Sequence, residues 1–190
     1  MITQNETEIL SCFFPKLVDF TAKDIEKKTG LSHETTFRLL KKIVQEKHLK
    51  EKKIGKTNVY EFVRDDLTYQ VFVHYVTKKR LVFKEKHLLI YKRLYEFINE
   101  VRPEGPAIIF GSYAKDTETK KSDIDLLCIT YKKNVSKLAK EFKTKYDLNI
   151  QVLTIKPSDF KNIKKDNQVF WGDLIEYGVV LDGIDYYFKE

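Results

Sequence analysis

The sequence predicts an α+β protein made of two unlike halves, and three observations support this fold class. Apolar residues recur at helical spacing early in the chain and are followed by two short β-prone runs around a turn. A longer helical pattern follows and ends at Pro103. Beyond it, apolar strand-like runs alternate with Gly-Ser and Asp-x-Asp signals. We therefore expect an N-terminal domain, a helical linker and a C-terminal domain at residues 1–64, 65–103 and 104–190.

Length and composition exclude several classes of protein. The 190 residues are 42% hydrophobic and contain only 2 Cys, so the chain can bury a core and is neither a disordered protein nor a disulfide-stapled miniprotein. No apolar run approaches the roughly 18 residues of a membrane span, and the start MITQNETEIL lacks the pattern of a signal peptide. We expect a cytoplasmic protein.

The basic charge is concentrated in the first half of the chain. Residues 1–64 hold 13 Lys and Arg against 9 Asp and Glu, and residues 65–103 hold 8 against 5. Residues 104–190 are neutral, with 14 against 14. This asymmetry suits an N-terminal part that faces nucleic acid, although a Lys-rich solvated surface gives the same count.

The first 30 residues carry signals for two short helices. Residues 4–14 have apolar side chains at helical spacing, and Pro15 follows the expected helix. Thr21 and Asp24 have capping-box spacing, so a second helix is expected from Ala22 to the Thr29-Gly30 turn.

A third helix should begin after Ser32, which is a favourable N-cap residue. Its inward positions are expected to be the apolar residues Leu39, Leu40, Ile43 and Val44. The residues left for its outer face include His33, Thr35, Thr36, Arg38, Lys41 and Lys42.

The β-prone runs Leu49–Ile54 and Val59–Val63 are joined by Gly55-Lys56-Thr57-Asn58, which predicts a hairpin. The order helix, helix, turn, helix, hairpin over about 60 residues resembles the winged helix-turn-helix of archaeal and bacterial regulators, in which the hairpin is called the wing. In that family the third helix contacts base edges and the wing contacts phosphate. The resemblance implies DNA-binding residues at Ser32, His33, Thr35, Thr36, Arg38, Lys52, Lys53 and Lys56.

Winged helices also serve as modules for protein interaction or dimerisation, so DNA is one of two expected partners of this domain. An electrophoretic shift at low and moderate salt distinguishes them, because phosphate contacts make DNA binding salt-dependent.

Residues 66–101 are expected to form two helices that link the halves. The run YQVFVHYV is rich in β-branched and aromatic residues, so a strand is the alternative for the first of them. We expect a homodimer through these helices, which light scattering would test.

The residues that carry chemistry begin after the strand-like run Ala-Ile-Ile-Phe. Gly111 allows a ligand to approach the backbone closely, and amides at the start of a helix form an anion site to which Ser112 adds a hydroxyl. Asp123 and Asp125 are two residues apart, so both carboxylates leave one face of the following strand. Two carboxylates at the end of a buried strand repel each other, and a divalent metal such as Mg²⁺ or Mn²⁺ would compensate their charge.

Strand, Gly-Ser, a step of eleven positions from Ser112 to the first Asp, and S-D-I-D-L-L into a second strand together resemble the DNA polymerase β-like nucleotidyltransferases, in particular the minimal members of that superfamily. The resemblance covers residues 107–155 and extends loosely to FWGDLIEYGVVLDG. It implies a mixed sheet flanked by helices and the transfer of a nucleoside monophosphate from a nucleoside triphosphate to a hydroxyl acceptor. The implied roles are nucleotide binding by Gly111, Ser112 and Lys115, and metal binding and catalysis by Asp123 and Asp125.

Two positions depart from the family pattern. Asp116 stands where a glycine is usual, and Asp tolerates positive φ better than most residues. Gln151 stands where active members have a third carboxylate, with Asn149 on the same face. An amide carries no charge with which to activate a hydroxyl, and loss of a general base typically costs about 10² to 10⁴-fold in rate.

Two functions therefore stay open. The chain is either a metal-dependent nucleotidyltransferase with a DNA-binding winged helix, or a catalytically weak or inactive nucleotide-sensing regulator. The second would act as a DNA-bound transcriptional regulator or as an antitoxin-like partner of a toxin-like protein. The acceptor in the first case is nucleic acid, a protein or a small molecule.

Overall fold

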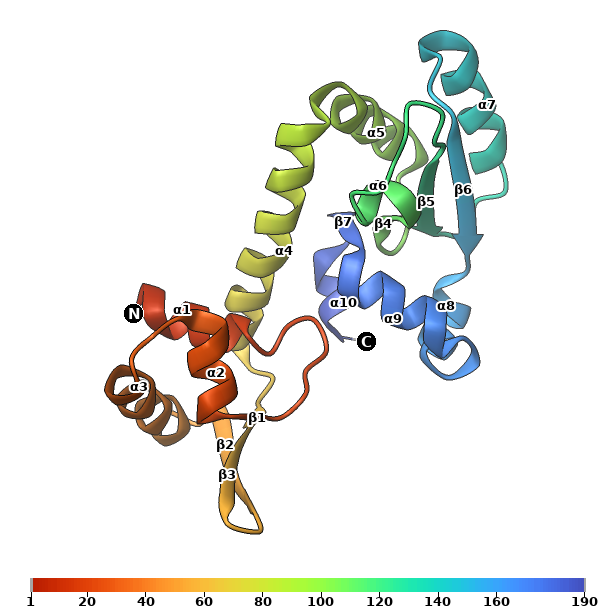
Figure 1. Ribbon diagram of the computed structural model, residues 1–190. Helices are drawn as coiled ribbons and strands as arrows, with labels where there is room; N and C mark the ends of the chain where they lie inside the picture. Colours follow the sequence, from red (N-terminus) through yellow and green to blue (C-terminus); the bar gives the residue numbers. More distant parts are fainter. Residues whose placement is uncertain (1, 190) are drawn as a thin grey trace. The chain divides into compact units, whose positions relative to one another are not determined.

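The computed structural model describes residues 2–189, which divide into two compact units at the boundary between residues 75 and 76. We call them the units of residues 1–75 and 76–190. The boundary between the units lies inside the long helix α4. The chain is of the mixed α+β class, as the sequence predicts, with helices and two sheets (Figure 1). No helix among the described residues has the length and apolar content of a bilayer span.

The unit of residues 1–75 combines three helices with a three-stranded antiparallel sheet of order β1-β3-β2. The hairpin of β2 and β3 extends beyond the helices of this unit (Figure 1). The elements, with the first part of α4 closing the unit, are α1 (Gln4–Ser11), β1 (Phe20–Thr21), α2 (Ala22–Thr29), α3 (His33–Gln45), β2 (Leu49–Ile54), β3 (Thr57–Phe62) and α4 (Asp66–Lys86).

Caps define the short helices of this unit as the sequence predicts. Thr21 and Asp24 form the expected capping box of α2, and Gly30 ends that helix in the left-handed conformation. The side chain of Ser32 accepts a hydrogen bond from the backbone N–H of Thr35 and so caps α3.

Two expectations about element ends are wrong. The first helix ends at Ser11 instead of residue 14, because Phe13 and Phe14 leave it to pack their rings against Phe62 of β3. The hairpin turn has two residues instead of four, since Ile54 pairs directly with Thr57. Gly55 makes this tight turn with a φ of 61°. The short strand β1, which pairs with β3, has no counterpart among the expected elements.

Residues 66–101 form two helices, and the alternative of a strand in YQVFVHYV is wrong. Val71, Phe72 and Val76 are buried on one side of the helix, and this burial overrides the β propensity of the run. The unit of residues 76–190 contains the elements α5 (Leu88–Val101), β4 (Ala107–Phe110), α6 (Gly111–Ala114), β5 (Ile124–Ile129), α7 (Val135–Tyr146), β6 (Ile150–Ile155), α8 (Pro157–Asp166), α9 (Gln168–Tyr177), β7 (Val179–Asp182) and α10 (Ile184–Lys189).

The sheet of the second unit is mixed and has the order β6-β5-β4-β7. Strands β5 and β6 are parallel, while the other two pairs are antiparallel. One face of the sheet packs on α5 and α7, where Phe97 and Phe142 meet edge to face. On the other face α9 packs against β4, where the ring of Phe170 meets that of Phe110.

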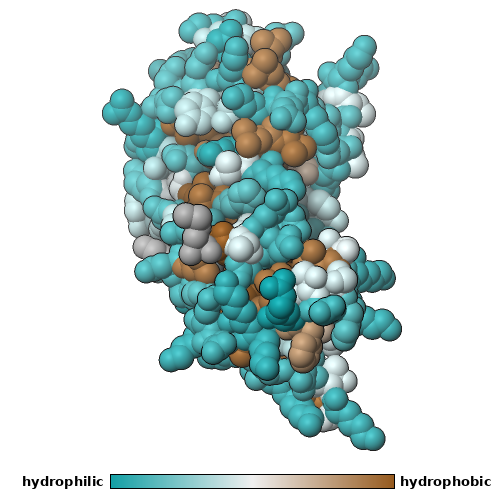
Figure 2. All heavy atoms as spheres, turned by 90° about the vertical axis from the view of Figure 1, so that its left-hand side faces the viewer, coloured by the Kyte–Doolittle hydropathy of each residue, from teal (hydrophilic) through white to brown (hydrophobic). Residues whose placement is uncertain are grey.

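Alternation along the strands decides which side chains enter which layer. Ile124 and Leu126 of β5 are buried in the core beneath α5 and α7. Asp123 and Asp125 therefore lie on the opposite face, the one on which α9 packs against β4. The face of the molecule shown in Figure 2 is mostly hydrophilic, with scattered hydrophobic patches, as expected when the large apolar side chains are gathered inside.

Candidate functional site

The two aspartates and Gly111 meet where β4 ends beside β5. Phe110, the last residue of β4, pairs with Asp125 of β5. The next residue, Gly111, has a φ of 68°, and a Cβ atom there would lie 2.0 Å from Oδ2 of Asp125. Glycine is thus required at this position for two reasons, the left-handed backbone and the close approach of the Asp125 carboxylate.

Asp123 is held by the two amides of the neighbouring strand. Asn149 donates a hydrogen bond to Oδ1 of Asp123, and Nε2 of Gln151 donates one to Oδ2 at 2.5 Å. Strand register explains the contact, because Asp125 of β5 pairs with Gln151 of the parallel strand β6. Gln151 therefore lies beside the aspartate pair.

The environments of the two aspartates move their pKa values in opposite directions. Hydrogen bonds from Asn149 and then Gln151 lower the pKa of Asp123. Burial, and then the negative charge of Asp123, raises the pKa of Asp125. The ionised form of Asp123 is thus stabilised by the amides, whereas the ionised form of Asp125 is disfavoured by burial and by the charge of Asp123.

Ser112 belongs to α6, directly after Gly111, and its backbone carbonyl accepts from Lys115 and Thr117. The side chain of Lys115 bonds to Asp173 of α9 at 2.7 Å, and its ammonium group lies 5.2 Å from the ring centre of Tyr177. Sequence reasoning missed this contact, because nothing in a linear pattern joins residues 58 positions apart.

Asp116, in the loop after α6, has a φ of 55°. It therefore adopts the positive φ that a residue in place of the usual glycine must tolerate. The two other carboxylates near the expected third position lie elsewhere. Asp147 is the left-handed C-cap residue of α7, and Asp159 lies in the first turn of α8.

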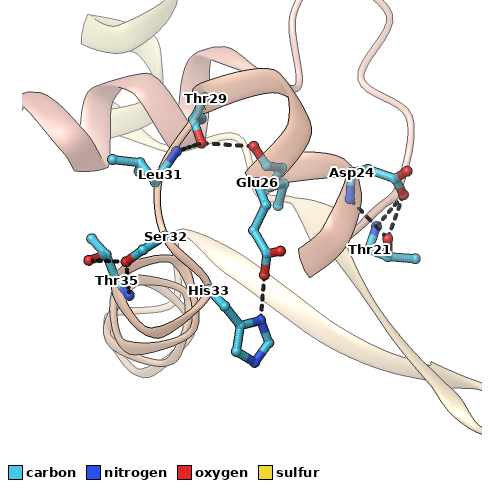
Figure 3. Close-up of polar contacts among 9 residues, drawn as sticks. Thr21, Asp24, Glu26, Thr29, Leu31, Ser32, His33 and Thr35 are labelled. Atoms are coloured by element: carbon cyan, nitrogen blue, oxygen red, sulfur yellow. Dashed lines mark hydrogen bonds and ion pairs between the residues drawn. The ribbon is translucent and has the colours of Figure 1, made fainter.

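The segment of α2, the turn and α3 is drawn in Figure 3. Ser32 and Thr35 bond to each other within the N-cap, and Nδ1 of His33 lies 2.6 Å from Oε1 of Glu26 on α2. His33 and Arg38 are exposed on α3. Glu26 belongs to α2 and His33 to α3, so this ion pair lies within the unit of residues 1–75.

The structure corrects one predicted DNA-binding residue. Thr36 is fully buried, with 0% exposure, because it sits one helical turn before Leu40 on the inner face of α3. Its hydroxyl has no hydrogen-bond partner within residues 2–189. The expected outer face instead includes Phe37, which is 53% exposed and stacks on His33 with ring centres 6.3 Å apart. Helical spacing from polar Glu34 could have identified Phe37 as an outward residue.

The three predicted lysines of the hairpin are exposed on β2 and its turn. Lys52 forms an ion pair with Glu61 of β3 at 2.8 Å. Lys53 lies across from Asn58, and Lys56 lies in the two-residue turn.

One curated protein is similar to part of this chain. A stretch of 86 residues is 34% identical to MJ1305 of Methanocaldococcus jannaschii, a protein named as a protein adenylyltransferase. The match covers 40% of this chain and 56% of that relative, so the chain spans about half the length of the curated protein it matches.

Two solved structures show weaker likeness. A toxin-antitoxin structure with AMP-PNP is 18% identical, with a TM-score of 0.37, over 49% of this chain and 73% of that chain. An IclR family transcriptional regulator from Brucella abortus is 13% identical, with a TM-score of 0.32, over 91% of this chain and 70% of that chain. At these low TM-scores neither likeness supports an inference about function.

Residues 92–186 match the family described as polymerase beta, nucleotidyltransferase. The matched range is half of the 190 residues and contains the whole sheet of the second unit, with Gly111, Asp123 and Asp125. The chain therefore belongs to the polymerase beta nucleotidyltransferase family.

Proposed function

We propose that the chain is a metal-dependent nucleotidyltransferase that transfers a nucleoside monophosphate from a nucleoside triphosphate to a hydroxyl acceptor. The observation that carries the proposal is the packing of Gly111 against Asp125, with Asp123 on the same strand face. This arrangement places a ligand-accessible backbone beside two carboxylates, in a chain of the nucleotidyltransferase family.

The donor set fits a divalent cation such as Mg²⁺ or Mn²⁺, which prefers carboxylate oxygens. Burial and the neighbouring charge of Asp123 disfavour ionisation of Asp125, and a cation bound to both would reverse that penalty. Asp123 and Asp125 would hold the ion, which would supply positive charge against the triphosphate.

The remaining residues of the site would bind and orient the nucleotide. Gly111 would let the phosphates approach the backbone, and Ser112 would donate its hydroxyl to a phosphate oxygen. Lys115 would contact phosphate by exchanging its present partner, Asp173. That exchange would couple α9 to nucleotide binding.

A second candidate function follows from the two amides on Asp123. Asn149 and Gln151 occupy both carboxylate oxygens of Asp123 with neutral donors, and neither amide can act as a general base. This observation favours a protein that binds a nucleotide with slow turnover or none, and that acts as a sensor in a regulator or an antitoxin-like partner.

Calorimetric titration of MgATP and MgGTP tests nucleotide binding. The proposal expects metal-dependent binding by the wild type and its loss in Asp123→Asn/Asp125→Asn. The variant Asp147→Asn/Asp159→Asn makes the same change of charge outside the site and should bind as the wild type does. Equal binding by the wild type and the Asp123/Asp125 variant would refute the proposal. Pyrophosphate release by the binding-competent wild type would then separate the transferase from the sensor.

We further propose that the unit of residues 1–75 is a winged helix that binds DNA through α3 and the hairpin. Its element order, the exposed His33 and Arg38, and the exposed lysines of β2 and its turn support this proposal. In such a domain the start of the third helix enters the major groove and the hairpin contacts phosphate. A gel-shift assay with duplex DNA at low and moderate salt tests it, and absence of any shift at low salt would refute it.

A further inference from the structure

A second cluster of metal-ligating side chains lies outside the aspartate pair. His87, Asp116 and Glu118 each offer one ligand atom, and these atoms all lie within 4.8 Å of one another. His87 is the residue between α4 and α5, whereas Asp116 and Glu118 belong to the loop that joins α6 to β5. The cluster therefore connects two segments of the second unit that are distant in sequence.

Two atoms of this cluster are buried without hydrogen-bond partners. Within residues 2–189, Nε2 of His87 and Oε2 of Glu118 are inaccessible to solvent and have no hydrogen-bond partner, although Nε2 is close enough to the other carboxylate oxygen of Glu118 for an ion pair. The His87 side chain is 15% exposed and that of Glu118 is 22% exposed. A buried polar atom without a partner costs about 1 to 3 kcal/mol, so such atoms usually serve a ligand, an ion or water.

The separation of the nearest ligand atoms suits a metal better than a hydrogen bond. Nε2 of His87 and Oε1 of Glu118 are 3.4 Å apart. An N–H···O hydrogen bond has its donor and acceptor about 2.7 to 3.2 Å apart. Two ligands at about 2.1 Å from a tetrahedral zinc ion lie about 3.4 Å apart.

The ring of His87 is already oriented by its neighbours. It packs against Phe83 with ring centres 4.9 Å apart, and it meets Tyr113 edge to face at 5.4 Å. A fixed imidazole loses little conformational entropy on binding an ion, as pre-organised ligands require.

Asp116 is the adjustable member of the cluster. Its side chain is 60% exposed, and one of its oxygens accepts from Nζ of Lys86 at 2.7 Å. A carboxylate has two oxygens, so Asp116 can serve Lys86 and a cation together. Because all three ligand atoms lie within 4.8 Å of one another, reaching a tetrahedral edge of about 3.4 Å needs a shift of at most about 1.4 Å, which rotation of an exposed side chain provides.

We propose that His87, Glu118 and Asp116 form a structural site for a first-row divalent cation of the zinc class, distinct from the aspartate pair. One imidazole and two carboxylates suit such an ion, because imidazole selects against Mg²⁺ and Ca²⁺ while zinc accepts both nitrogen and oxygen ligands. The bound ion ties the loop between α6 and β5 to the junction of α4 and α5. Since that loop joins Gly111 to Asp123, the ion stabilises the frame of the nucleotide site without taking part in transfer.

Zinc titration of the full chain in excess Mg²⁺ tests the proposal, with a competing chromophoric chelator as the readout. We expect one saturable zinc site in the wild type and in Asp123→Asn/Asp125→Asn. Glu118→Gln and His87→Gln should weaken it at least about tenfold. His74→Gln is the matched control, because His74 is an exposed histidine of α4 outside the cluster, and it should bind zinc as the wild type does.

Two further measurements keep the test independent of folding defects. Zinc should raise the unfolding temperature of the wild type but not that of Glu118→Gln, which retains the shape of the side chain. In ¹⁵N spectra of the histidine rings, zinc should shift Nε2 of His87 and leave His74 unchanged. Absence of saturable zinc binding, or equal affinity in the wild type and Glu118→Gln, would overturn the proposal. An unchanged ¹⁵N shift of His87 Nε2 on addition of zinc would overturn it as well.

Discussion

Replacing Gly111 by alanine probes the close contact on which the aspartate pair depends. The added Cβ atom would lie 2.0 Å from Oδ2 and 2.9 Å from Cγ of Asp125. The left-handed backbone costs a non-glycine residue about 1 to 2 kcal/mol, and overpacking typically costs about 1 to 3 kcal/mol more. We therefore expect Gly111→Ala to lower the free energy of unfolding of the second unit by about 2 to 5 kcal/mol.

A double-mutant cycle separates the steric cost from the backbone cost. Asp125→Ala removes the two nearest atoms, so Gly111→Ala in that background should cost only about 1 to 2 kcal/mol. Gly55→Ala is the backbone control, because Gly55 has a φ of 61° and no atom within 4 Å of an added Cβ. It should also cost about 1 to 2 kcal/mol.

Urea unfolding provides the assay for the cycle. The single tryptophan, Trp171, belongs to α9 and reports on the second unit by fluorescence, while far-UV circular dichroism follows Gly55→Ala in the first unit. Equal costs of Gly111→Ala in the wild-type and Asp125→Ala backgrounds would show that the glycine is not needed for the approach of the carboxylate.

The remaining predictions concern the pH dependence of the first unit, the amide beside Asp123 and the proposed DNA contacts. Burial alone would raise the pKa of Glu6, but hydrogen bonds from Lys42 and Thr3 outweigh it and lower the pKa to about 2. Ionised Glu6 therefore stabilises the first unit fully at pH values above 4.5, its ordinary pKa, and this stability should be lost as the pH falls toward 2. Urea unfolding at several pH values should show a weaker pH dependence for Glu6→Gln than for the wild type. Gln151→Glu restores a carboxylate and should tighten Mn²⁺ binding and raise pyrophosphate release by about 10² to 10⁴-fold if the missing base limits the rate, whereas unchanged metal affinity would place the amide outside the metal site. Arg38→Ala should reduce the slope of log affinity against log salt for duplex DNA by about one if Arg38 contacts phosphate, and an unchanged slope and affinity would remove Arg38 from the interface.

Local signals in the sequence were sufficient for much of the secondary structure. The capping box of Thr21 and Asp24 and the N-cap at Ser32 are predicted correctly, because each depends on residues three positions apart. The period of two along β5 likewise places Asp123 and Asp125 on one face opposite the buried Ile124.

Predictions failed where packing between distant segments decided the outcome. The first helix ends early because Phe13 and Phe14 pack against β3, and Thr36 is buried because the inner face of α3 is wider than its apolar residues suggest. The packing of Phe13 and Phe14 leaves no local signal in the sequence, since it depends on where β3 lies. Thr36 differs, because its place one helical turn before Leu40 is a local signal that its polar side chain obscured.

The sequence by itself determined the α+β class, the Gly-Ser and Asp-x-Asp pattern and the amide at position 151, because these are local or periodic features. Only the tertiary structure decided that Gln151 bonds to Asp123, that Lys115 bonds to Asp173 and that His87 lies beside Glu118. The physical reason is strand register and helix packing. They bring together residues 28 to 58 positions apart in the first two cases, and side chains at such separations meet only when a whole core has formed.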